Sequence, residues 1–317
     1  MEEVPFFKKS ISFFLNKSII SISDMSKEDV LCVLSYAKIC ENLTEPLLKG
    51  KVIASLFFEP STRTRLSFEA AANKLGARVI SVTDVLASSA VKGETLSDTI
   101  RMVEGYVDCI ILRHNLEGSA RLASQVSSKP VINAGDGANQ HPTQTLLDLY
   151  AIVKTQKKID GLTIAIAGDL KYGRTAHSLA IALSLFDCTI ICISPKGLEM
   201  PDYILQVLEK RKRKVICSES FQEHIAQLDI LYMTRIQKER FVEEIEYQKI
   251  KSEYRLEKKH LVSVKPHLKI LHPLPRVDEI HTDVDTTPYA HYFKQATDGL
   301  FVRQALLGLI LGGFDEH

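Results

Sequence analysis

The chain of 317 residues is long enough for two domains of ordinary size, each with its own hydrophobic core. Its hydrophobic content of 45% and its charged content of 25% are typical of a soluble globular protein. The formal net charge of +1 gives no electrostatic reason to expect a nucleic acid or an anionic membrane as a partner.

Short runs rich in Val, Ile and Leu alternate with helical patterns along the whole chain. The runs predict strands at 51–58, 78–82, 107–113, 130–133, 162–168, 188–194, 214–218, 229–234 and 268–272. The helical patterns fall near 26–41, 62–75, 95–105, 117–126, 142–155, 174–186, 200–213, 221–227 and 289–311. Continuous apolar strands between helices are typical of parallel sheets that are covered on both faces. We therefore expect an α/β protein with doubly wound parallel sheets.

A polar stretch at 154–161, "KTQKKIDG", follows a long helical pattern and precedes a new strand. It predicts a boundary between a first domain, 1–153, and a second domain that starts at 154. Open sheets of this kind bind ligands beyond the carboxyl ends of their strands. Polar residues at strand ends are therefore the candidates for a functional site.

The stretch "EPSTRTRLSFE" at 59–69 lies where the first predicted strand gives way to a helix. Free backbone N–H groups and the helix dipole attract an anion to such a place. The hydroxyls of Ser61, Thr62 and Thr64 and the guanidinium of Arg63 would complete a phosphate site. A simple N-cap explains one hydroxyl but not the cluster.

The segment "AGDGANQHPTQTLLDLY" at 134–150 predicts a loop and then a helix with Pro142 at its first position. His141 and Gln144 would lie on one side of the first turn. They could hold a polar acyl group together or could merely cap the helix, and the sequence leaves both readings open.

The segment "IAIAGDLKYGRTAHSLA" at 164–180 predicts a strand, a glycine turn and a helix. It fits the P-loop pattern except that Arg174 stands in place of the lysine that reaches the terminal phosphates. The spacing of a dinucleotide-binding loop is absent too. A nucleotide site is therefore a poor match here.

Two further strand ends lie in "LYMTRIQKER" at 231–240 and "ILHPLPRVDE" at 270–279. Arg235 and Gln237 would face one way in an extended chain. Arg174 and Arg235 could each bind a carboxylate, which implies a dicarboxylic ligand, although either arginine alone is more often a surface charge. The prolines in "HPLP" predict an extended backbone whose Leu274 carbonyl is an acceptor.

The six cysteines form no CxxC pair and no zinc spacing; they are Cys32, Cys40, Cys109, Cys188, Cys192 and Cys217. Most lie in apolar runs, where cysteine behaves as a small hydrophobic residue. No apolar stretch is long enough to cross a bilayer, and the N-terminus lacks a signal-peptide pattern. We therefore expect a reduced, cytoplasmic protein without a metal or other cofactor.

Six motifs, in order, make the chain resemble the catalytic subunits of the aspartate carbamoyltransferase family. They are "FFEPSTRTRLSFE", "KGETLSDT", "NAGDGANQHPTQTLLDL", "GDLKYGRTAHSL", "DILYMTRIQKER" and "HPLPRVDEI". The resemblance implies transfer of the carbamoyl group of carbamoyl phosphate to L-aspartate, an early step in pyrimidine biosynthesis. It also implies a carbamoyl phosphate-binding domain at 1–153, an aspartate-binding domain at 154–296 and a C-terminal helix, 297–317, that returns to the first domain.

The resemblance carries roles to residues that match the motifs. The phosphate would be held by Ser61, Thr62, Arg63 and Thr64. The carbamoyl group would be bound by Thr64, Arg113, His141 and Gln144, with the backbone of Leu274 and Pro275. Aspartate would be bound by Lys92, Arg174, Arg235, Gln237 and Leu274. The catalytic set would be Arg63, Thr64, Lys92, Arg113 and His141.

In the family each active site is shared between subunits, so the resemblance implies a homotrimer in which Ser88 and Lys92 reach the neighbouring site. A regulatory chain is a further possible partner. Salt bridges of the closed state would involve Glu59, Lys171, Arg240 and Glu246. The Glu246 match is the weakest, because "ERFVEEIEYQKI" carries an apparent insertion.

Three other functions are compatible with parts of the sequence. An ornithine carbamoyltransferase is disfavoured, because those enzymes have "HCLP" in place of "HPLP" and lack "TRIQKER". A P-loop kinase is disfavoured by Arg174. A catalytically silent scaffold is disfavoured because each residue that the chemistry needs is present.

Overall fold

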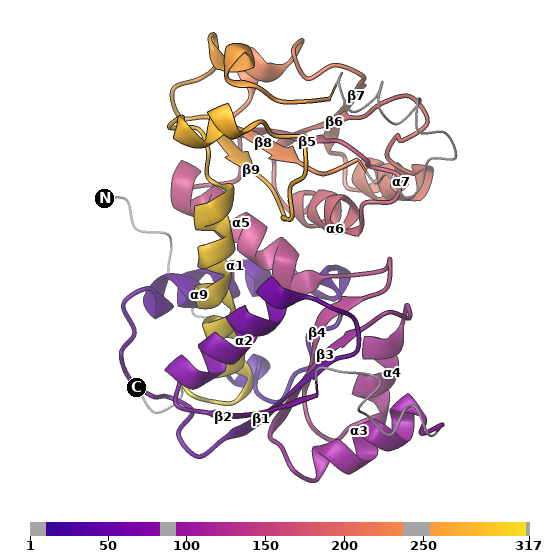
Figure 1. Cartoon of the computed structure of the whole chain (residues 1–317), viewed down its shortest axis with the longest axis vertical. Coiled ribbons are helices and arrows are strands. Elements are labelled where there is room, and N and C mark those ends of the chain that lie inside the picture. Colours follow the sequence, from indigo (N-terminus) through magenta and orange to yellow (C-terminus); the bar gives the residue numbers. More distant parts are fainter. Residues whose placement is uncertain (1–10, 83–92, 237–253, 315–317) are drawn as a thin grey trace. The chain divides into compact units, whose positions relative to one another are not determined.

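The computed structural model describes residues 11–82, 93–236 and 254–314 of the 317-residue chain. The chain forms two compact units (Figure 1). Unit 1 comprises residues 1–147 and 297–317, and unit 2 comprises residues 148–296. The division falls inside helix α5 (Pro142–Gln156), a few residues before the boundary that the sequence suggested.

Unit 1 contains a parallel sheet with the strand order β2-β1-β3-β4. Its strands are β1 (Val52–Phe57), β2 (Arg78–Val82), β3 (Cys109–His114) and β4 (Val131–Asp136). Its helices are α1 (Lys27–Cys40), α2 (Thr62–Lys74), α3 (Leu96–Glu104) and α4 (Ser119–Val126), with the start of α5 and the end of α9 (Tyr292–Ile310).

Alternate side chains of β1 and β3 point to opposite faces of this sheet, and both sets are buried because helices cover both faces. Leu56 and Leu112 pack with residues of α3 and α4 in one apolar cluster. Ile53 and Ile111 are buried on the other face. Such burial explains why these strands read as unbroken apolar runs.

The C-terminal helix α9 ends in unit 1, as predicted. Arg303 of this helix donates a hydrogen bond from Nη1 to the Ser67 hydroxyl of α2 at 2.9 Å. Its guanidinium also lies 4.9 Å from the centre of the Phe68 ring. Helix α9 therefore supports the helix whose first turn is the predicted phosphate site.

Unit 2 contains a second parallel sheet, with the order β7-β6-β5-β8-β9. Its strands are β5 (Thr163–Ala167), β6 (Thr189–Ile193), β7 (Lys214–Ser218), β8 (Ile230–Met233) and β9 (Lys269–Leu271). Helices α6 (Arg174–Leu183) and α7 (Asp202–Lys210) connect the first three of these strands. All nine predicted strands are thus present in the two sheets, and each end lies within three residues of its predicted position.

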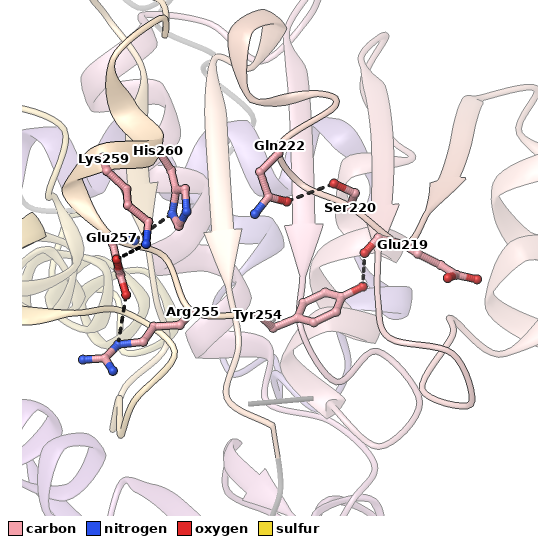
Figure 2. A pocket seen from close by; sticks show the side chains of 8 residues that line it. All are labelled: Glu219, Ser220, Gln222, Tyr254, Arg255, Glu257, Lys259 and His260. Atoms are coloured by element: carbon pink, nitrogen blue, oxygen red, sulfur yellow. Dashed lines mark hydrogen bonds and ion pairs between the residues drawn. The ribbon is translucent and has the colours of Figure 1, made fainter. Parts of the chain in front are cut away.

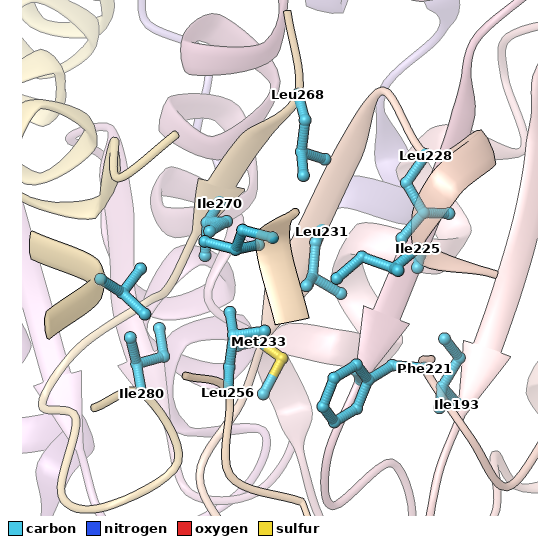
Figure 3. Packing of buried hydrophobic residues seen from close by; sticks show 14 of the residues in the cluster. Ile193, Phe221, Ile225, Leu228, Leu231, Met233, Leu256, Leu268, Ile270 and Ile280 are labelled. Atoms are coloured by element: carbon cyan, nitrogen blue, oxygen red, sulfur yellow. The ribbon is translucent and has the colours of Figure 1, made fainter. Parts of the chain in front are cut away.

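The helix predicted at 221–227 was wrong. Only a short 3₁₀ turn forms there, at Ile225–Gln227. Figure 3 shows the reason: Phe221 and Ile225 are inserted into the apolar cluster on one face of the second sheet, with Met233 and Leu256. Irregular segments cover much of this face, and so short a segment takes its conformation from its packing and not from helix propensity.

The order of the strands marks one special position in each sheet. In unit 1 the chain runs from β1 to β2 on one side of the sheet and from β3 to β4 on the other. In unit 2 it likewise runs from β5 to β6 on one side and from β8 to β9 on the other. Loops that leave neighbouring strands in opposite directions open a crevice at the carboxyl edge. This rule selects the ends of β1 and β3 in unit 1 and of β5 and β8 in unit 2.

Within the described ranges, every helix is too short or too polar to span a lipid bilayer.

The end of β5 depends on Gly168, whose φ of +124° is unfavourable for other residues. A Cβ atom here would lie 2.3 Å from the carbonyl oxygen of Thr234, just after β8. We expect Gly168→Ala to lower the free energy of unfolding by about 3 kcal/mol, from strain and overlap together. Urea unfolding followed by circular dichroism measures this change.

The matched control is Gly197→Ala. Gly197 also has a positive φ, +89°, but nothing lies within 4 Å of its added Cβ. Gly197→Ala should therefore lower the free energy of unfolding only through backbone strain, by about 1 kcal/mol. Equal losses in both variants would contradict the proposed contact with Thr234.

Candidate active site

The first turn of α2 follows the end of β1 and carries the predicted phosphate-binding residues. Ser61 occupies the N-cap position, but its side chain makes no capping bond. The first helical bond runs from the Arg65 N–H to the Ser61 carbonyl at 3.1 Å. The N–H groups of residues 62–64 therefore precede the hydrogen-bonded part of the helix. Thr62 and Arg63 are exposed, whereas Thr64 is buried.

Thr64 meets His141 at the start of α5. The Thr64 hydroxyl lies 3.4 Å from His141 Nε2, and both side chains are buried. The His141 carbonyl accepts the N–H of Gln144 at 3.0 Å, so its backbone begins the helix while its ring points to α2. Pro142 is the first helical residue, as predicted. Gln144 lies on the same first turn and is half-buried.

Arg113 lies at the end of β3, beside the end of β1, and is 7% exposed. Its Nη2 is 3.1 Å from Glu59 Oε1, and its Nη1 donates to the Ala134 carbonyl at 3.0 Å. The structure buries Arg113 between the loop that follows β1 and strand β4.

The loop before His141 is organised by Asp136, which sequence reasoning did not single out. Asp136 is 1% exposed. Its Oδ1 accepts from Asn133 Nδ2 at 2.9 Å and from the Gln140 N–H at 3.0 Å. Its Oδ2 accepts from the Gly118 N–H at 3.0 Å. One carboxylate thus fixes the path of the chain into α5 and the position of the His141 ring.

In unit 2 the loop between β5 and α6 is shaped by Asp169 and His177. Asp169 Oδ1 accepts the Tyr172 N–H at 3.0 Å. His177 Nε2 lies 2.6 Å from the Leu170 carbonyl, so Nε2 carries the proton and Nδ1 accepts from Tyr203. Burial lowers the pKa of His177, which favours this neutral form.

This loop places Arg174 as the first residue of α6. Arg235 follows β8, the direct neighbour of β5 in the sheet, and both arginines are half-buried. The structure therefore puts both at the carboxyl edge that the strand order selects. Lys171 is exposed, with Nζ 5.4 Å from the centre of the Tyr172 ring.

The extended backbone predicted for "HPLP" was wrong. Leu274 has a φ of +55°, and the Leu274–Pro275 peptide bond is cis. The Leu274 N–H donates to His272 Nδ1 at 2.8 Å, and this bond folds the segment into a turn. Because Nδ1 accepts, Nε2 carries the proton and donates to Glu279 Oε1 at 2.6 Å.

Glu279 also accepts the N–H groups of Val277 and Asp278, so it organises the far side of the turn. Burial alone would raise the pKa of Glu279, but its hydrogen bonds to His272 and to the backbone outweigh burial and lower it. Neither His272 nor Glu279 was a sequence candidate. Their seven-residue spacing gives no pattern that would reveal the contact.

A buried network lies behind this turn. The Tyr232 hydroxyl of β8 donates to Asp148 Oδ2 at 2.8 Å, and Gln295 Nε2 donates to Asp148 Oδ1 at 2.6 Å. Gln295 Oε1 in turn accepts the His272 N–H at 2.8 Å. Burial and the neighbouring Asp148 raise the pKa of Tyr232, which remains a neutral donor. The ends of β8 and β9 are thereby tied to α5 and α9.

Ser88, Lys92, Gln237, Arg240 and Glu246 lie outside the described residues. In the part of the chain that the structure describes, no group of three or more His, Cys, Asp or Glu side chains is arranged to hold a metal ion.

A separate hollow of about 430 Å³ lies in unit 2, beyond the end of β7 (Figure 2). Lys259 and Arg255 both pair with Glu257, and the Tyr254 hydroxyl donates to the Glu219 carbonyl. The charges that line this hollow therefore largely neutralise one another. It contains none of the predicted site residues, and we assign no substrate to it.

Two family models match the chain in succession. Residues 17–154 match the "Aspartate/ornithine carbamoyltransferase, carbamoyl-P binding domain", and residues 160–310 match the "Asp/Orn binding domain" of the same enzymes. A curated relative, the "Aspartate carbamoyltransferase catalytic subunit 2" of Shewanella halifaxensis, is 55% identical over 298 residues, or 93% of this chain and 96% of the relative. The chain belongs to the aspartate/ornithine carbamoyltransferase family.

Solved structures of carbamoyltransferases share the fold. The catalytic subunit of M. jannaschii aspartate transcarbamoylase is 49% identical, with a TM-score of 0.89 over 95% of this chain and 100% of that chain. Trypanosoma cruzi aspartate transcarbamoylase in complex with carbamoyl phosphate and aspartate is 35% identical, with a TM-score of 0.88 over 94% of this chain and 96% of that chain. Another structure of the latter carbamoyltransferase contains carbamoyl aspartate and phosphate.

The contacts of Glu279 predict a pH-dependent stability for this carbamoyltransferase. Because the folded pKa of Glu279 lies below its usual 4.5, its ionised form contributes fully above about pH 4.5, and the contribution is lost as pH falls through the folded pKa. Glu279→Gln should lower the free energy of unfolding by about 2 kcal/mol at neutral pH, since an amide cannot accept all these bonds.

Urea unfolding of both forms between neutral and acidic pH tests this expectation. The difference in unfolding free energy between the parent and Glu279→Gln should shrink as pH falls below about 4.5 and through the folded pKa. Glu257→Gln is the control, because its partner Lys259 is exposed and such pairs contribute little. A difference that stays constant down to acidic pH would show that Glu279 does not act through its charge.

Proposed function

We propose that the chain transfers the carbamoyl group of carbamoyl phosphate to the amine of L-aspartate, giving N-carbamoyl-L-aspartate and phosphate, as in de novo pyrimidine biosynthesis. The supporting observation is the cluster at the carboxyl edge of the first sheet. There the first turn of α2, the buried Arg113 and the His141 ring come together. The cluster offers several hydrogen-bond donors to one small anion.

The phosphate is bound at the first turn of α2 by Ser61, Thr62, Arg63 and Thr64. Backbone N–H groups at a helix start suit a phosphate, and an arginine adds a forked contact. The carbamoyl oxygen is bound by Thr64, Arg113 and His141. The carbamoyl amide is bound by Gln144, with backbone carbonyls of Leu274 and Pro275.

Aspartate is bound by Arg174 and Arg235, each through one carboxylate, with Gln237, Lys92 and the Leu274 carbonyl. Two guanidinium groups at the edge between β5 and β8 match a dicarboxylic acceptor. Ornithine has a single carboxylate and a second amine, so it would leave one arginine without a partner. The residues therefore favour aspartate within a family that includes both activities.

The reaction begins when the amine of aspartate attacks the carbamoyl carbon. A tetrahedral intermediate forms, and the negative charge that develops on its oxygen is stabilised by Arg113 and His141. The C–O bond to phosphate then breaks, and Arg63 stabilises the charge on the departing group. The phosphate itself accepts the proton of the amine. Lys92 completes the positive field around the two anionic substrates.

A homotrimer with shared sites is part of this proposal, with Ser88 and Lys92 contributed to the neighbouring subunit. The name "catalytic subunit" of the Shewanella halifaxensis relative supports a separate regulatory chain as a possible further partner. We also propose that the enzyme works in the cytoplasm, without a metal or other cofactor.

The first test offers carbamoyl phosphate with either L-aspartate or L-ornithine to the purified chain and identifies the product by mass spectrometry. Aspartate alone should give a carbamoylated product. Product from ornithine alone would contradict the assignment of Arg174 and Arg235 but not that of the phosphate site. If a correctly assembled trimer gives no product from either substrate, the result would favour a catalytically silent scaffold over an enzyme.

The second test compares Arg63→Ala with Arg65→Ala. Arg63 should act mainly on the transition state, so its loss should lower kcat by about 10²- to 10³-fold and change the KM for carbamoyl phosphate much less. Arg65 is on the same helix, but its Nε faces Glu69 at 3.9 Å. The Arg65→Ala variant should keep both kcat and the KM for carbamoyl phosphate within about threefold of the parent values. A change in KM alone for Arg63→Ala would contradict its assigned role.

A further inference from the structure

Cys192 and Cys217 lie opposite each other in the second sheet. Strands β6 and β7 are parallel neighbours, and Cys192 is the register partner of Cys217. Neighbouring strands lie about 4.8 Å apart, within the range of about 4.4–6.8 Å that disulfide-bonded Cα atoms span. The backbone therefore already holds the two residues at a distance that a disulfide allows.

The two side chains also share one face of the sheet. Ile191 and Ile193 of β6 pack into the cluster of Figure 3, and Ile216 of β7 packs against it. Because successive side chains alternate, Cys192 and Cys217 both point to the opposite face. The sheet thus aligns both thiols in register and in direction.

The pair combines an accessible thiol with a protected one. Strand β7 is at the edge of the sheet, and Cys217 is exposed, whereas Cys192 is 2% exposed. The other cysteines, Cys32, Cys40, Cys109 and Cys188, are all buried. An oxidant in solution therefore meets Cys217 first.

The two thiols are also in direct contact. A hydrogen bond from Cys192 lowers the pKa of Cys217 to about 7 and raises that of Cys192. A substantial fraction of Cys217 is then thiolate at neutral pH, and the thiolate is the reactive form. Cys192 stays protonated and is poised beside it.

We propose that Cys217 and Cys192 form a reversible redox pair, in which a hydroperoxide oxidises Cys217 and Cys192 then closes an intrachain disulfide between β7 and β6. This pair is separate from the proposed active site. Its place in the sheet, and not a sequence motif, defines it, since 24 residues lie between the two cysteines.

The chemistry proceeds in two steps. The Cys217 thiolate attacks one oxygen of the peroxide, the O–O bond breaks, and Cys217 becomes a sulfenic acid while the other oxygen leaves as hydroxide or alkoxide and takes up a proton. The Cys192 sulfur then attacks the Cys217 sulfur. The S–S bond forms, the S–O bond breaks, and the oxygen leaves as water with the Cys192 proton. Two electrons pass from the two thiols to the peroxide, and a dithiol reverses the change.

The test treats the full-length chain with hydrogen peroxide, blocks the remaining thiols with N-ethylmaleimide and measures the intact mass. The parent should lose two hydrogen atoms and regain them with dithiothreitol. Trypsin should then yield a linked pair of peptides, residues 175–196 and 215–235. Cys217→Ser, an exposed substitution, should abolish the link.

Two variants sharpen the result. Cys188→Ala should leave the link intact, because Cys188 lies in the same peptide but its Sγ faces the Leu183 carbonyl at 3.6 Å. In Cys192→Ala the sulfenic acid has no resolving thiol, so Cys217 should gain oxygen atoms instead. A parent chain whose mass is unchanged by peroxide, a link that persists in Cys217→Ser, or linkage only between two chains would each overturn the proposal.

Discussion

A backbone N–H group that leaves the end of a parallel strand has no partner in the sheet, yet it cannot remain buried without one. In this chain carboxylates meet that need. Asp136 accepts the N–H groups of Gly118 and Gln140, Asp169 accepts that of Tyr172, and Glu279 accepts those of Val277 and Asp278. These few hydrogen bonds determine where the loops lie, and the loops carry the functional side chains.

This use of carboxylates has an electrostatic consequence for the site. Asp136, Asp169 and Glu279 are bound to backbone groups and are buried, so much of their charge is neutralised locally. Among the described residues, the candidate binding groups at the carboxyl edges of the sheets are donors and cations: hydroxyls, helix-start N–H groups and arginines. A protein that binds two anions needs this distribution, because exposed carboxylates at the same edge would oppose their binding.

Much of the fold could be predicted because burial leaves a regular trace in the sequence. Strands covered on both faces give continuous apolar runs, and all nine predicted runs became strands. The helix prediction at 221–227 was wrong because it rested on spacing alone. Phe221 and Ile225 are four residues apart, as on one face of a helix, but both are buried in an apolar cluster by a segment that is largely irregular.

The candidate site was predictable only in part. Chemical type and position at a strand end were enough to select Ser61–Thr64, His141, Arg174 and Arg235. The groups that position them were not, because the bonds of Asp136 and of His272 with Glu279 depend on loop paths that no periodicity records. The turn at Leu274 could not be predicted for the same reason. The two prolines suggested an extended backbone, but the hydrogen bond from the Leu274 N–H to His272 accompanies a turn.

The division of the chain also bears on how the protein is made. Unit 1 contains residues from both ends of the sequence, while unit 2 is continuous. A ribosome therefore completes all of unit 2 before it adds the residues of α9, such as Arg303, that pack on α2. The helix that carries the proposed phosphate site therefore gains the contacts of Arg303 only after unit 2 has been made. A chain that stopped directly after residue 296 would contain all of unit 2, yet it would lack part of unit 1, the unit that was begun first.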